Sequence, residues 1–116
     1  MKIRMTVGDR GITATLIDSP TTRDFVSLLP LTLTLRDYVG AEKIGELPKR
    51  LSIQDAPPGM DPSIGDIAYY APWGNVAIFY RDQPYASGLV ILGSLDAGTE
   101  ALDTSGSEKV TIELLD

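Results

Sequence analysis

Apolar and polar residues alternate along much of the chain, and this pattern predicts a protein built mainly of β-strands. Four stretches place an apolar side chain at every second position, as strands with one buried face do: 2–7, 12–17, 31–36 and 109–115. Two further stretches, 75–81 and 88–95, are apolar on both faces, which is typical of strands covered on both sides. Shorter strands are expected at 50–53 and 66–71, so the pattern predicts eight strands.

One helix is expected between the second and third of these strands. Ser19 suits the N-cap, and Pro20 suits the first helical position, where its missing N–H costs nothing. Three apolar residues then share one helical face and a proline ends the pattern: Phe25, Leu28, Leu29 and Pro30. The sequence therefore predicts one short helix, about residues 20–29, that covers one mouth of the strand assembly.

Eight strands favour a closed β-barrel, because closure leaves no strand edge exposed and eight strands enclose a filled interior. The length of 116 residues suits a single domain over 1–116. Residues 37–65 are expected to be mostly loop, because they contain four of the eight prolines.

The composition excludes several kinds of binding and catalysis, but it does not identify a function. The net charge of −6 and scattered basic residues argue against binding of nucleic acid or an anionic membrane. The chain has no cysteine and no histidine, which excludes thiolate chemistry, the usual zinc sites and the usual general base. Loop carboxylates such as Asp61 and Asp66 fit turns, so no metal and no cofactor is expected. Without a signal peptide or a long apolar run, we expect a soluble, cytoplasmic protein.

Four segments, 18–25, 28–35, 42–44 and above all GDIAYYAPWGNVAIFY at 65–80, resemble a bacterial and archaeal family of small cyclophilin-like proteins of unknown function. The resemblance runs over nearly the whole chain and implies a cyclophilin-like barrel. It does not imply prolyl isomerase activity. The sequence has no His and no Phe-Met-x-Gln-like segment, so no catalytic residue carries over position by position.

Aromatic residues gather around one predicted hairpin and form the best candidate for a binding surface. Tyr70, Trp73 and Tyr80 are the candidate ligand-binding residues, while Tyr69 must face the opposite side of its strand from Tyr70. Ordinary barrel packing with a tryptophan capping a turn explains the same pattern. Trp73, on the turn, is expected to be at least half exposed.

Two arginines are weak catalytic candidates. An Arg that donates a hydrogen bond to a prolyl nitrogen weakens the amide resonance that gives the bond its barrier of about 18–20 kcal/mol. Arg36 ends the third strand, but the alternation places it outside among threonines, on the polar face. Arg23 lies one turn into the helix, where pairing with Asp18 or Asp37 is the simpler role.

Three hypotheses follow from these observations. The leading one is a binding module that holds a small molecule or peptide in an aromatic-lined groove. The second is a weak peptidyl-prolyl cis-trans isomerase, and the third is a homodimer or an interaction subunit.

Overall fold

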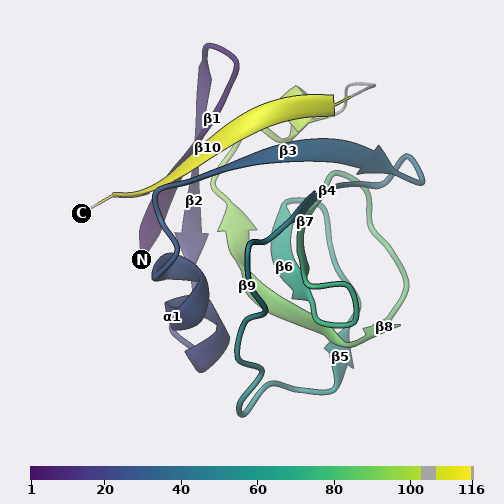
Figure 1. Cartoon of the computed structure of the whole chain (residues 1–116). Helices are drawn as coiled ribbons and strands as arrows, with labels where there is room; N and C mark the ends of the chain where they lie inside the picture. The colour runs from purple at the N-terminus through teal and green to yellow at the C-terminus, as the bar shows by residue number, and fades with distance from the viewer. Residues whose placement is uncertain (103–106, 116) are drawn as a thin grey trace.

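Eight antiparallel strands close into a barrel in the computed structural model, which describes residues 1–102 and 107–115 (Figure 1). Around the barrel the order is β1 (Lys2–Val7), β10 (Ser107–Leu115), β3 (Leu31–Tyr38), β4 (Glu42–Glu46), β7 (Asn75–Phe79), β6 (Asp66–Tyr70), β9 (Leu89–Leu95) and β2 (Arg10–Leu16). Two short strands, β5 (Gly59–Met60) and β8 (Ala86–Ser87), pair outside the barrel. The mainly β, closed eight-stranded barrel expected from the alternation is confirmed.

The inward side chains of the strands form the main core. In β1, Ile3 and Met5 are buried while Lys2 and Arg4 are exposed, as the period of two requires. Gly93 of β9 lies where β2 crosses closely: a Cβ placed there would lie 2.2 Å from the carbonyl oxygen of Thr15. A side chain at Gly93 would therefore push two paired barrel strands apart.

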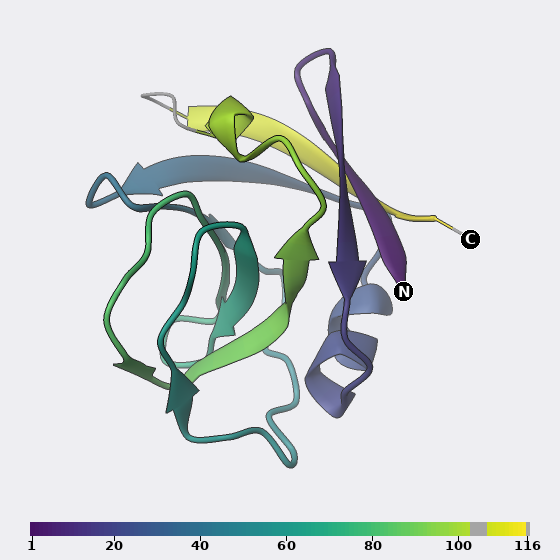
Figure 2. The ribbon, with the colours of Figure 1, turned by 180° about the vertical axis from the view of Figure 1, so that it is seen from behind.

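A short helix lies at one end of the barrel, α1 (Pro20–Val26), and the 3-10 helix η1 (Thr99–Leu102) lies at the other (Figures 1 and 2). The Ser19 hydroxyl caps α1 by accepting a hydrogen bond from the Thr22 N–H at 3.1 Å. Phe25 is fully buried in the barrel core, so α1 covers that end as expected. The helix ends at Val26, three residues before the expected end. Each described helix is too short to cross a membrane.

One strand was predicted in the wrong place. No strand forms at residues 50–53, and the barrel instead uses β4, whose sequence EKIGE shows no apolar alternation. The inward positions of β4 are Lys43, which is buried beside Asp37 (Nζ to Oδ1, 3.7 Å), and Gly45, whose place is filled by the Leu35 side chain. Because the inward face carries a cation and a glycine, the usual apolar pattern is missing.

A second, smaller apolar cluster covers the outer face of β4, β7, β6 and β9. All five residues of β7 are buried, because its inner face packs in the barrel and its outer face packs under the loops that carry β5 and β8. The outer cluster contains Ile44, Ala68, Ala77, Phe79 and Leu89. This loop-covered outer face is where the candidate site lies.

Candidate functional site

The floor of a pocket is formed by two rows of side chains on the outer face of the sheet. In one row, strand pairing sets Tyr38 of β3 opposite Glu42 of β4, and Glu42 opposite Phe79 of β7. Directly paired residues on one sheet face lie about 4.5–5.5 Å apart at Cβ, so these three side chains are neighbours.

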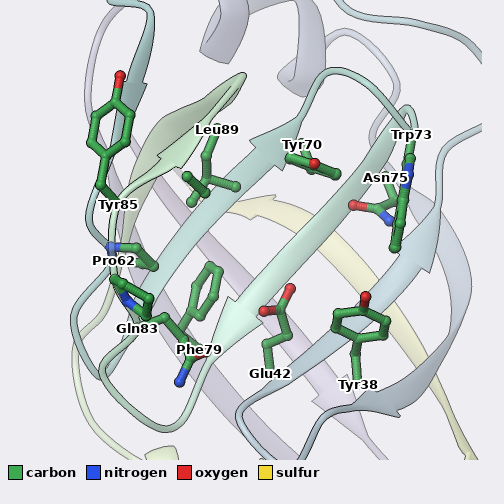
Figure 3. A pocket seen from close by; sticks show the side chains of 12 residues that line it. Tyr38, Glu42, Pro62, Tyr70, Trp73, Asn75, Phe79, Gln83, Tyr85 and Leu89 are labelled. Atoms are coloured by element: carbon green, nitrogen blue, oxygen red, sulfur yellow. The ribbon is translucent and has the colours of Figure 1, made fainter.

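The second row crosses three strands of the same face. Pairing sets Asn75 of β7 opposite Tyr70 of β6, and Tyr70 opposite Leu89 of β9. The two rows lie on either side of a middle row of Ile44, Ala77 and Ala68, with Glu42 and Asn75 both turned toward the interior of the pocket (Figure 3).

Three aromatic rings form one wall. The turn between β6 and β7 is tightened by hydrogen bonds from the Trp73 and Gly74 N–H groups to the Tyr70 carbonyl, at 3.2 and 2.8 Å. This turn brings the Trp73 ring edge-on to Tyr70, with centroids 5.3 Å apart. Trp73 also meets Tyr38 at 5.4 Å and an angle of 90°. The rings therefore hold each other in place and present faces in different directions (Figure 3).

The opposite wall comes from the loops on either side of β5 and β8. Gln83 is tied to the other loop by a hydrogen bond from its N–H to the Pro62 carbonyl, at 3.1 Å. The pocket is partly open to solvent and has a volume of about 240 Å³. Its lining consists of Tyr38, Glu42, Pro62, Tyr70, Trp73, Asn75, Phe79, Gln83, Pro84, Tyr85, Ala86 and Leu89.

Asn75 is the most unusual residue in this lining. Its side chain is 1% exposed, and neither its Oδ1 nor its Nδ2 has a hydrogen-bond partner among the described residues. A buried polar group without a partner costs about 1–3 kcal/mol relative to one that is satisfied. The amide therefore has one acceptor and two donors that are unsatisfied beside the pocket.

Glu42 is the one carboxylate that lines the described pocket. Burial beside Tyr38 and Phe79 disfavours its charged form and raises its pKa from an ordinary 4.5 to about 7. Among the residues that the structure describes, none donates a hydrogen bond to Glu42 or forms an ion pair with it. No basic side chain among the lining residues therefore compensates the negative charge of Glu42.

The aromatic residues chosen from the sequence divide between two places. Tyr70 and Trp73 line the pocket, and Trp73 is 48% exposed, slightly less than the half or more that was expected. Tyr80 lies inside the barrel with Tyr69, because it continues the inward series of β7. Its hydroxyl donates a hydrogen bond to Asp37, and that bond is the main cause of the lowered pKa of Asp37.

Neither candidate arginine reaches the pocket. Arg36 lies on the outer face of β3 and forms an ion pair with Glu46 at 3.1 Å. Arg23 is exposed on α1 and pairs with Asp18, one of its two expected partners. Both arginines occupy the structural roles that the alternation and the helix position favoured.

Four lining residues of importance were not singled out from the sequence: Tyr38, Glu42, Asn75 and Phe79. The local pattern could have indicated Asn75 as a site residue, because it is a polar residue at the start of a strand that is otherwise apolar on both faces. Glu42 and Tyr38 carried none, because their place in the pocket depends on the pairing of β3, β4 and β7.

Comparisons with known proteins agree with this architecture. A family model described as the cyclophilin-like family matches residues 5–113. The fold is similar to the solution structure of a hypothetical protein from Archaeoglobus fulgidus, with a TM-score of 0.74 and 20% sequence identity over 97% of this chain and 93% of that one. The search of curated proteins found no match. The match over almost the full length shows that the chain belongs to the cyclophilin-like family.

Proposed function

We propose that this protein is a binding module that holds a small organic molecule in the pocket on the outer face of β4, β7, β6 and β9. The observation that carries the proposal is Asn75, a fully buried amide whose polar atoms have no partner among the described residues. A polar group buried at this cost on a pocket floor is explained by a ligand that supplies the missing hydrogen bonds.

The walls support the same function. Rings of Tyr38, Tyr70 and Trp73 form one wall of a mostly apolar space, and a few polar groups point into it, which is the usual composition of ligand sites. The volume of about 240 Å³ is below the range of drug-sized pockets, so it favours a small molecule over an extended peptide.

A fluorescence screen of small fragments tests the proposal directly. Trp73 is the single tryptophan of the chain and stands in the pocket wall, so its emission reports on occupancy. We expect a subset of fragments to change the emission saturably, and the same fragments to bind more weakly to Asn75→Leu. A screen in which no fragment saturates, or in which Asn75→Leu binds every hit unchanged, contradicts the proposal.

Weak prolyl isomerase activity stays a prediction, as does the homodimer. The placement of the arginines lends the isomerase no support, since Arg36 and Arg23 are engaged by Glu46 and Asp18 away from the pocket. Exchange NMR on Xaa-Pro peptides decides this point, because uncatalysed exchange takes tens of seconds or longer. New exchange cross-peaks that vanish in Arg36→Ala or Arg23→Ala would establish the activity.

A further inference from the structure

We propose that the ligand is an organic cation, a protonated amine with an apolar group attached, held by the Glu42 carboxylate between the rings of Tyr38, Tyr70 and Trp73. This inference rests on the proposed binding function and names the chemical class that the pocket selects. Three features carry it: the charge of the lining, the orientation of the rings, and the partners left open by two polar side chains.

The charge of the lining has one sign. Glu42 is acidic, and none of the twelve lining residues in the described part of the chain is Lys or Arg. The nearest basic residue along the strand, Lys43, points to the opposite face, where it is buried beside Asp37. Glu46 shares the outer face with Glu42, but it pairs with Arg36. A cation entering the pocket would therefore meet one uncompensated carboxylate and no repelling charge.

The rings are placed to stabilise that cation. Aromatic faces attract ammonium groups when the cation lies within about 6 Å of the ring centroid, and the effect grows when water is excluded. Trp73 stands at 90° to Tyr38 and 79° to Tyr70, so the three rings of this wall turn their faces in different directions instead of stacking. In Figure 3 the Glu42 carboxylate lies between the rings of Phe79 and Tyr38.

Two polar side chains supply the hydrogen bonds. An ammonium N–H can donate to the Glu42 carboxylate and another to Asn75 Oδ1, which is an acceptor without a partner among the described residues. Phe79 and Leu89 on the floor contact the apolar part. A primary or secondary amine satisfies this set, whereas a carboxylate or phosphate would face Glu42.

The state of Glu42 makes the inference testable by pH. Burial raises the pKa of Glu42 to about 7, so its carboxyl is largely neutral below that pH and charged above it. Alkylammonium groups, like lysine with a pKa of about 10.4, stay protonated across this range. Binding of an amine should therefore strengthen as pH rises through about 7, and it should release protons when it occurs near or below that pH.

The experiment compares 2-phenylethylamine with 2-phenylethanol and with 3-phenylpropionate, which have similar shapes and carry positive, no and negative charge. Titrations follow Trp73 emission at about pH 8.5 and about pH 5.5, on either side of the Glu42 pKa of about 7. We expect the amine to bind at least about tenfold more tightly than the alcohol at the higher pH, the ratio that 1.4 kcal/mol produces. We expect this preference to shrink at the lower pH and in Glu42→Gln.

Glu46→Gln is the matched control, because Glu46 lies on the same face of β4, is exposed and does not line the pocket. It should keep the preference for the amine. Equal binding of amine and alcohol in the wild-type protein, or tighter binding of 3-phenylpropionate, would overturn the cation while leaving a small-molecule site in place. Absence of saturable binding by all three compounds would also overturn it, and the fragment screen then judges the binding function separately. Loss of the preference in Glu46→Gln would show that Glu42 is not its source.

Discussion

Replacing Asn75 by leucine should stabilise this protein, although it alters a fully buried residue. In the wild-type protein, folding removes the Asn75 amide from water and gives it no hydrogen bond among the described residues. Leucine has a similar size and branching but no polar atom, so it removes this cost without opening a large cavity.

The expected gain follows from the burial. An unsatisfied buried polar group costs about 1–3 kcal/mol, and replacing it with an apolar group of the same shape recovers that amount. For a domain of this length, each kcal/mol corresponds to a rise in Tm of about 4 °C. We therefore expect Asn75→Leu to raise the free energy of unfolding by about 1–3 kcal/mol and to raise Tm by about 4–12 °C.

Urea unfolding monitored by far-ultraviolet circular dichroism measures the change. The midpoint should rise while the slope with urea stays constant, because a changed slope would indicate an altered denatured or native state. Asn75→Asp is the matched control: it keeps the shape but buries a charge at the position opposite Glu46, so it should destabilise the protein at neutral pH. The reasoning is refuted if Asn75→Leu lowers the free energy of unfolding by 1 kcal/mol or more, a loss on the order of one hydrogen bond. That result would mean that the amide is already satisfied without a ligand.

Three further predictions concern stability. The pKa of Glu42 is about 7 in the folded protein and 4.5 ordinarily, so between these pH values the unfolded chain binds fewer protons than the folded one. The contribution of Glu42 to the free energy of unfolding should therefore fall as pH rises through this range. Urea titrations should show this fall in the wild type and not in Glu42→Gln. Gly93→Ala should lower the free energy of unfolding by about 2 kcal/mol or more, because the added Cβ would lie 2.2 Å from the Thr15 carbonyl oxygen. Gly11→Ala is the control: its Cβ would lie 3.7 Å from the nearest atom, so the same unfolding assay should show a much smaller loss. Val39→Asn should raise Tm by a few degrees, because Val39 has a φ of 51°, where a β-branched residue costs about 1–2 kcal/mol; an unchanged or lower Tm would contradict strain at this turn.

The sequence predicted the barrel well where strands have one apolar face. In β1, β2, β3 and β10 the buried residues are those that the alternation selects. It failed at β4, because a buried lysine and a glycine occupy the inward positions there, and tertiary contacts with Asp37 and Leu35 replace the apolar pattern. It also predicted a strand at 50–53, where the structure has an irregular loop whose Leu51 side chain is buried in the core. The count of eight barrel strands was therefore correct although one strand was misplaced.

Only part of the pocket could be predicted from the sequence, for a similar reason. Tyr70 and Trp73 belong to one hairpin, so nearness in sequence was enough to group them. Tyr80 belongs to the same hairpin, but the period of two turns it into the barrel. Glu42 reaches the pocket only through the register that sets it opposite Phe79, and no local pattern encodes a pairing between residues so far apart.

The central claim is that the outer-face pocket binds a small molecule through Asn75, and the side-chain amide of that residue gives the most direct measurement. In proton–nitrogen correlation spectra of the labelled protein, a hit from the fragment screen should shift the Asn75 amide pair and the Trp73 indole resonance together and saturably. The chemical shifts of β10, which lies across the barrel from β6 and β7, should stay unchanged. Shifts of Trp73 without Asn75, or shifts spread over β10 as strongly as over the pocket, would contradict the account.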